Sequence, residues 1–264
     1  MQSDPLRKLL GEVPAFLALL RSVECRLYEK AQPFEEPVLD LGCGDGCFAA
    51  AAFASPPCVG VDRNLCLTRE ARVRGACRTG IAASAIELPL PSESFRSVIS
   101  NSVLEHIENV DAAIQEVARV LSLGGDFYFT VPSHRFGNLL LGSTLARTLG
   151  LKSLAQWYAD GFNRRSVHYH VDRPEVWIQR LEAQGFRVVQ WFSYFPPEAH
   201  RVFDFAHYLS LPSLLTRKTM GKWVLFPHSI FRRLFERWFR AYTADYLSDK
   251  GAYLFFHARK AGRE

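Results

Sequence analysis

Short aliphatic runs alternate along the chain with segments whose apolar residues recur every three or four positions. Aliphatic runs bounded by Gly or Pro predict buried strands, and the wider spacing predicts helices that cover them. Strand-like runs occupy 38–41, 59–62, 97–100, 126–131, 187–195 and 251–260. Helical spacing occupies 1–34, 64–75, 110–121 and 173–185, with Gly124-Gly125 expected to stop the third helix. This alternation predicts an α/β protein with a doubly wound, mostly parallel sheet.

A glycine loop follows the first predicted strand. Gly42, Gly44 and Gly46 are separated by single residues, and small side chains follow at 49–52. Glycine allows the chain to turn sharply and lets a ligand approach the backbone closely. The helix that follows presents unpaired N–H groups at its start. The turn is therefore a predicted site for a nucleotide-type cofactor.

The loop departs from the pattern that binds a dinucleotide. The G-x-G-x-x-G fingerprint needs a third glycine at position 47, where this chain has Cys47. Asp40 and Asp45 would repel a pyrophosphate and suit a cofactor that carries an ammonium group. Asp62 ends the next strand, twenty residues after Gly42, where an acid can reach ribose hydroxyls. An NAD-dependent oxidoreductase therefore stays open only as a less favoured alternative.

Five stretches in this order resemble the class I S-adenosylmethionine-dependent methyltransferases of the type 11 group. They are VLDLGCGDG at 38–46, GVDRN at 60–64, ELPLPSESF at 87–95, VISNSVLEHI at 98–107 and ARVLSLGGDFYFTVP at 118–132. The resemblance implies a Rossmann-like seven-stranded sheet with an antiparallel last strand. It also implies in-line transfer of the methyl group of S-adenosyl-L-methionine, which releases S-adenosyl-L-homocysteine. A cofactor-binding scaffold without catalysis is the second alternative.

The same resemblance assigns the cofactor site residue by residue. It implies that the methionine part of the cofactor is held by Asp40, Gly42, Cys43 and Gly44, and that Asp62 binds the ribose. It also implies that the adenine is contacted by Arg63, Ser84 and Ala85, and that Asn101 lies beside the methyl group. Position 84 has a hydroxyl where the family usually has an acid. Asp40 can also be interpreted as a structural acid that binds loop amides, and Cys43 and Cys47 are interpreted as packing residues.

His106 is the candidate catalytic residue, because an imidazole titrates near neutral pH and can act as a general base. It can equally serve to orient the next helix. The sulfonium donor is already activated, so alignment alone can supply much of the catalysis. Further candidates for substrate or cofactor contact are Arg21, Glu24, His134, Arg165, His168, Tyr169 and His170.

The chain divides into a core and added segments. We expect a helical segment at 1–34, a core at 35–195 and 251–262, an irregular substrate lid at 133–170 and a basic, aromatic insertion at 196–250. Within the insertion, 230–242 places aromatic residues on one helix face and arginines on the other. Such a helix can pack over the active site, lie on an anionic membrane or form a dimer interface. The aromatic content suggests a partly apolar small molecule or lipid-linked acceptor.

Composition narrows the partners and the compartment. The net charge of +5 is mild, and residues 196–250 supply +4 of it, so nucleic acid is not an expected partner. Six cysteines lie in the first third without a CxxC pair or finger-like spacing, which predicts neither a disulfide framework nor a metal. No run approaches the roughly 18 apolar residues of a membrane span. We expect a cytoplasmic protein, with peripheral membrane contact through 230–242 as an added hypothesis.

Overall fold

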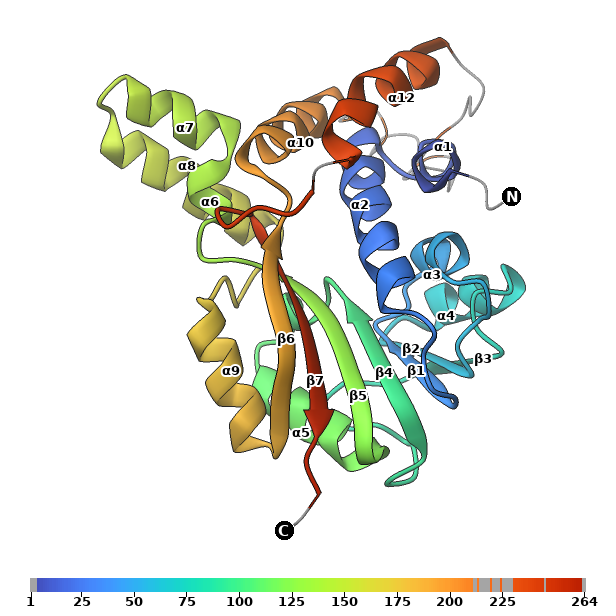
Figure 1. Cartoon of the computed structure of the whole chain (residues 1–264). Helices are drawn as coiled ribbons and strands as arrows, with labels where there is room; N and C mark the ends of the chain where they lie inside the picture. The colour runs from blue at the N-terminus through green and yellow to red at the C-terminus, as the bar shows by residue number, and fades with distance from the viewer. Residues whose placement is uncertain are drawn as a thin grey trace.

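The computed structural model describes residues 4–210, 213, 219, 224, 230–244 and 246–262 of the chain. One seven-stranded sheet organises them, in the order β3-β2-β1-β4-β5-β7-β6 (Figure 1). The strands are β1 Val38–Leu41, β2 Val59–Asp62, β3 Thr79–Ala82, β4 Phe95–Asn101, β5 Leu121–Pro132, β6 Phe186–Tyr194 and β7 Tyr253–Lys260. β7 runs antiparallel to both β5 and β6, and the other neighbouring pairs are parallel. The predicted fold class is confirmed.

Helices cover both faces of this sheet. One face packs against α2 (Ala15–Ala31) and α3 (Cys47–Ala52), with α1 (Pro5–Leu9) beside them and α4 (Leu65–Val73) along β2 and β3. The other face packs against α5 (Val110–Val120) and α9 (Pro174–Ala183). Asn64 and Asn109 begin α4 and α5 by accepting hydrogen bonds from backbone N–H groups of the first turn. An apolar layer on each face therefore packs the sheet between the two sets of helices.

A group of helices gathers above one edge of the sheet, at the top of Figure 1. It contains α6 (Phe136–Leu139), α7 (Leu141–Thr148), α8 (Lys152–Arg165), α10 (Pro197–Leu209) and α12 (Ile230–Thr243). The parallel strands end at this edge, and the strand order reverses there between β1 and β4. In open α/β sheets, ligands bind in the crevice at such a reversal. The short 3-10 helix η1 (Leu104–His106) follows β4 at this point.

Several predicted elements need correction. Residues 133–172 are largely helical and not irregular, because α6, α7 and α8 occupy most of them. The N-terminal segment forms two helices, separated by a turn that ends at Pro14. The third helix ends at Val120 and passes directly into β5, so Gly124-Gly125 lie inside that strand and do not stop the helix. The sequence pattern missed β3, whose four half-exposed residues at the sheet edge form no aliphatic run.

The amphipathic helix predicted at 230–242 is α12. Phe239 is buried, and Phe235, Trp238 and Tyr242 are half-buried against the core that includes α2. Arg233 and Arg237 are exposed on its other side. Part of the insertion, 211–229 apart from positions 213, 219 and 224, lies outside the described residues. Among the described residues no helix has the length and apolar character that crossing a bilayer requires.

Candidate functional site

Three cavities meet at the edge where the parallel strands end. Their volumes are about 620, 140 and 190 Å³. Gly42 lines the first two, Leu17 and Arg21 line the second and third, and Ser102 and His106 line the first and third. A ligand that crosses Gly42 can therefore reach the first two cavities, and each of these shares two lining residues with the third.

The 620 Å³ cavity, named here the adenosine cavity, contains the predicted ribose and adenine residues. Asp62, Arg63, Ser84 and Ala85 all line it, as does the half-exposed Tyr169. Asp62 accepts a hydrogen bond from Gly44 N (3.1 Å) and another from Asn64 N (2.9 Å). The carboxylate thus holds the loop in place while it borders the cavity where the ribose is predicted.

The 140 Å³ cavity, named here the amino-acid cavity, contains the other predicted cofactor residues. Asp40, Gly42, Cys43, Gly44 and Asn101 line it. The Asp40 side chain is 5% exposed, and no described residue donates a hydrogen bond to it. Burial raises the pKa of Asp40 to about 7, and the charge of Asp62 adds to this shift. An unpartnered buried carboxyl of this kind is suited to a ligand cation.

Gly42 lines both of these cavities. Its φ of +84° is in the left-handed region, and an added Cβ would lie 2.3 Å from Val103 Cγ2. The Gly42 and Cys43 N–H groups both donate to Val61 O, at 2.7 and 3.0 Å. The loop therefore lets a ligand approach the backbone closely and gives the cavities a polar wall. Its Gly42 and Cys43 N–H groups are already bonded and are not free to bind that ligand. Only glycine fits position 42 without displacing Val103.

Glu24, a buried acid on α2, connects several residues that line these cavities. Glu24 is fully buried and accepts four hydrogen bonds at 2.7 to 3.0 Å, from Arg21, Asn101, Ser102 and Tyr194. The amide oxygen of Asn101 in turn accepts from Thr130 Oγ1 at 2.8 Å. Both polar atoms of Asn101 are thus engaged within the protein. Glu24 does not line a described cavity, so it positions the residues that do.

The 190 Å³ cavity, named here the acceptor cavity, has an aromatic wall and a polar end. Aromatic rings come from Phe16, Phe136, Phe162, Phe203 and Tyr253, on five different elements or segments. The polar residues are Arg21, Ser102, Glu105, His106, Ser166, His168 and His207. Burial raises the pKa of Glu105 to about 8 and lowers the pKa of His106. Burial and the neighbouring His106 also lower the pKa of His168 to about 4.

His106 stands between the adenosine and acceptor cavities. Its Nδ1 lies 3.1 Å from Val167 O, an atom that can only accept, so this nitrogen carries the proton. The Nε2 atom then has a free lone pair, 3.8 Å from Glu105 Oε1. Val167 and Ser102 both have positive φ, 54° and 52°, which is uncommon for residues with a side chain. Such backbone conformations concentrate at functional sites.

Several sequence candidates lie elsewhere. His170 Nε2 faces the carbonyls of Ile107 and Glu108, and its Nδ1 faces Asp172, so it supports the turn after η1. His134 and Arg165 line none of the three cavities. Burial raises the pKa of Cys47 to about 12 and also raises that of Cys43, which agrees with their interpretation as packing residues. The sequence did not indicate Ser102, Glu105 or Phe203, although Glu105 adjoins His106 in the same motif.

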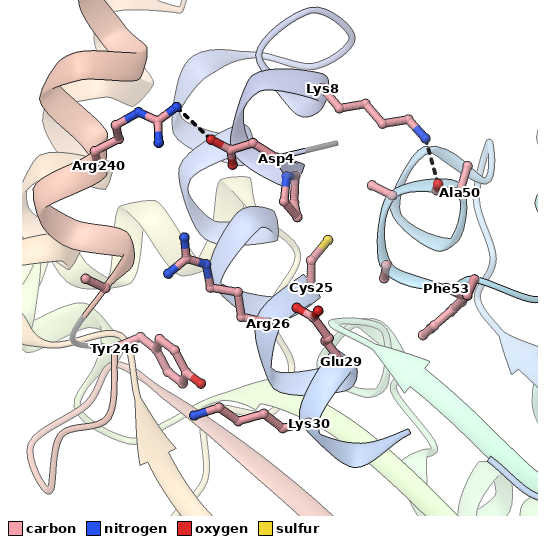
Figure 2. A pocket seen from close by; sticks show the side chains of 15 residues that line it. Asp4, Lys8, Cys25, Arg26, Glu29, Lys30, Ala50, Phe53, Arg240 and Tyr246 are labelled. Carbon is pink, nitrogen blue, oxygen red and sulfur yellow. Dashed lines mark hydrogen bonds and ion pairs between the residues drawn. The ribbon is translucent and has the colours of Figure 1, made fainter. Parts of the chain in front are cut away.

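A larger cavity of about 920 Å³ lies between α1, α2, α3 and α12 (Figure 2). Its charged side chains include Lys8, Arg26, Lys30 and the ion pair of Arg240 with Asp4 (2.8 Å). Lys8 donates to Ala50 O, and Arg26 donates to Thr243 O. It shares no described lining residue with the other three cavities. Size therefore does not identify the site, since every predicted cofactor residue lies around the smaller cavities.

Comparison with known proteins shows similarity to methyltransferases. Residues 39–129 match the family model of a methyltransferase domain. An uncharacterized methyltransferase of Mycobacterium tuberculosis is 32% identical over 126 residues, which cover 46% of this chain and 64% of that protein. A ubiquinone biosynthesis O-methyltransferase of Agrobacterium fabrum is 27% identical over 191 residues, which cover 67% of this chain and 71% of that protein. The alignment thus spans just under two thirds of the mycobacterial relative.

The fold comparison reaches further along the chain. A geranyl diphosphate C-methyltransferase of Streptomyces coelicolor, solved with S-adenosyl-L-homocysteine, superposes with a TM-score of 0.57. The superposition covers 93% of this chain and 79% of that one, at 12% identity. At this identity the likeness concerns the fold alone, including the strands that the family model does not match.

Proposed function

This chain belongs to the class I S-adenosylmethionine-dependent methyltransferases, and we propose that it transfers the cofactor's methyl group to a ring-containing small molecule or lipid-like acceptor. The observation that carries the proposal is the meeting of three cavities around Gly42, Arg21, Ser102 and His106. A cofactor bound across Gly42 would bring its sulfonium centre close to the residues that these cavities share with the acceptor cavity. Methyl transfer requires this juxtaposition of donor and acceptor.

The charges around the amino-acid cavity suit the methionine part of the cofactor. Asp40 offers an unpartnered carboxyl to the ammonium group. Arg21 lines the same cavity and keeps donors beyond the one that binds Glu24 Oε2 at 2.7 Å, so it can bind the carboxylate. The adenosine cavity would take the rest of the cofactor. Asp62 would bind the ribose, and Arg63, Ser84, Ala85 and Tyr169, which line the same cavity, would contact the adenine.

The acceptor cavity supports a ring-sized acceptor group. An apolar cavity of about 150 Å³ can bind benzene, and this one has 190 Å³ with five aromatic rings in its wall. A lipid-like tail would have to remain outside, because the cavity has room for little more than one ring. One relative is named a ubiquinone biosynthesis O-methyltransferase, and methyl transfer to an oxygen atom is compatible with the proposal.

His106 is the protein group we propose beside the reacting atom. Its free Nε2 and its neutral form suit it to take a proton from an acceptor, or to hold the acceptor in line with the sulfonium. Displacement then forms the bond from the acceptor atom to the methyl carbon and breaks the bond from that carbon to sulfur. The departing sulfide is neutral and needs no protonation.

An acceptor screen tests the proposal. The purified protein is incubated with S-adenosyl-L-methionine and phenolic, quinol, amine and polyketide-like acceptors, and S-adenosyl-L-homocysteine release is measured. We expect release with at least one ring-containing acceptor, and its loss in Asp40→Ala. Tight cofactor binding without turnover on any acceptor would favour a scaffold, and NAD binding in place of S-adenosyl-L-methionine would favour an oxidoreductase.

A further inference from the structure

We propose that Glu105, His106 and His168 bind one divalent first-row metal ion, and that this ion binds a hydroxyl oxygen of the acceptor. The proposal extends the methyl-transfer function proposed above and rests on it for the role of the ion. It departs from the sequence, which predicts no metal. The three residues could not be grouped from spacing, because His168 lies 62 positions after His106.

The three side chains converge at the polar end of the acceptor cavity. One ligand atom from each lies within 4.8 Å of the others. His106 Nε2 and Glu105 Oε1 are 3.8 Å apart, and the rings of His106 and His168 are 5.3 Å apart between centroids. All three residues line the acceptor cavity, and His106 also faces the adenosine cavity. An ion at this place would lie beside the point where the methyl group is transferred.

Each imidazole is held in the form that a metal requires. His106 Nδ1 donates to Val167 O, and His168 Nδ1 lies 3.2 Å from Asn163 Oδ1, which leaves the Nε2 atom of both rings free. Metal-binding histidines usually donate their other ring N–H to a carbonyl or carboxylate oxygen in this way. Neither ring needs to lose a proton before it binds an ion.

Glu105 is buried, and one of its carboxyl oxygens has no hydrogen-bond partner among the described residues. Its side chain is 2% exposed, and Oε2 has no hydrogen-bond partner among the described residues. A buried carboxylate without a partner is costly, and a bound cation removes that cost. The nearby positive charge of Arg21 is compensated by Glu24, at 2.7 Å. Among the described residues no unpaired cation is therefore left to neutralise Glu105, whose carboxyl would release its proton on binding a metal ion.

Two imidazoles and one carboxylate favour a particular class of ion. This ligand set suits borderline divalent ions such as Zn²⁺, Co²⁺ or Fe²⁺, and leaves coordination positions open. Here the open positions would face the aromatic wall of the acceptor cavity. A ring that carries a hydroxyl group can fill the cavity and reach the ion at once.

The ion would activate that hydroxyl for methylation. Binding to a divalent ion lowers the pKa of an oxygen ligand, so the hydroxyl proton passes to solvent and the oxygen stays as an anion. This oxygen attacks the sulfonium methyl group, which forms the O–CH₃ bond and breaks the S–CH₃ bond. The two electrons of the broken bond stay on sulfur and give the neutral sulfide. His106 then acts as a ligand and not as the base.

Cobalt titration of the untagged chain tests the site. After treatment with EDTA and its removal, we expect one equivalent of Co²⁺ to bind and give the visible spectrum of a nitrogen and oxygen site. Glu105→Gln and His168→Asn should each weaken binding by about tenfold or more, and Asn163→Leu should do so through His168. His170→Asn is the matched control, because both nitrogens of that ring face other groups. It should bind Co²⁺ as the wild type does.

Three results would overturn the proposal. They are absence of stoichiometric binding, equal binding by the Glu105 and His168 variants, and a thiolate-to-cobalt charge-transfer band that assigns the ion to a cysteine. A second measurement adds catechol to the cobalt-loaded protein. A shifted cobalt spectrum would support binding of the acceptor hydroxyl to the ion, and an unchanged spectrum would contradict it. S-adenosyl-L-homocysteine titration of every variant checks folding. It also separates the two proposals, since the cofactor site can fail while the cobalt site binds.

Discussion

The cofactor side and the acceptor side of the site are built in different ways. The cofactor side takes most of its residues from the ends of neighbouring strands and the loops that follow them, within 40–109. Tyr169 adds to the adenosine cavity, and Leu9, Val13, Leu17 and Arg21 of the N-terminal segment add to the amino-acid cavity. The acceptor side takes its rings from α2, α6, α8, α10 and β7, between positions 16 and 253. The first contains the acids at the strand ends, and the second has the aromatic wall. The fold thus fixes the donor by short motifs, while distant added helices shape the space for the acceptor.

The two sides are joined by α2. Arg21 lines both the amino-acid and the acceptor cavities, and Glu24 binds residues of β4, of the turn after it and of β6. If this helix aligns the two sides, changes on it should affect both, whereas changes on one side should leave the other intact. The predictions below test this separation.

Removal of Glu24 should have the largest effect. Glu24→Ala leaves the half-buried Arg21 charge without its partner, along with three other polar groups. Loss of one member of a buried pair costs about 3–5 kcal/mol of unfolding free energy. Chemical denaturation measures this loss. Glu29→Ala, at an exposed position of the same helix, should change stability by no more than about 0.5 kcal/mol. Equal losses of stability in the two variants would contradict the central role assigned to Glu24.

Variants at Asp40 and His106 test directly whether the cofactor side and the acceptor side act independently. Asp40→Ala should weaken S-adenosyl-L-homocysteine binding by about 1–3 kcal/mol, because a charged hydrogen-bond partner is lost. His106→Gln should leave that affinity nearly unchanged and reduce methyl transfer. Calorimetry and the product-release assay measure the two quantities. Equal loss of cofactor affinity in both variants would show that the two sides are not separable.

The pH dependence of cofactor binding should give a smaller effect. The pKa of Asp40 in the empty site is about 7, so its carboxyl is mostly neutral at pH 6 and mostly ionised at pH 8. Since the cofactor ammonium needs the ionised form, affinity should rise about tenfold over this interval. In the empty protein the raised pKa works the opposite way, and stability falls as pH rises from about 4 to about 7. Asp40→Asn should remove both dependences, and a pH profile that it leaves unaltered would contradict the assignment.

The sequence predicted the cofactor side better than the acceptor side for a physical reason. Asp40, Gly42 and Asp62 lie at strand ends, so a local pattern of aliphatic residues, glycines and acids places them. β3 was missed because an exposed edge strand carries no buried run. The role of Glu24 could not be deduced, because its four donors lie up to 170 positions away. The acceptor cavity likewise depends on how helices pack over the sheet, which no short motif records.

The most direct test compares two cofactor analogues in two proteins. S-adenosyl-L-homocysteine has the amino-acid part, and 5′-methylthioadenosine lacks it, so only the first can meet Asp40. Calorimetric titration should show that Asp40→Asn weakens binding of S-adenosyl-L-homocysteine by about 1–3 kcal/mol and leaves 5′-methylthioadenosine unaffected. Equal weakening of both analogues, or no binding of S-adenosyl-L-homocysteine by the wild type, would contradict a cofactor that crosses Gly42 from Asp62 to Asp40.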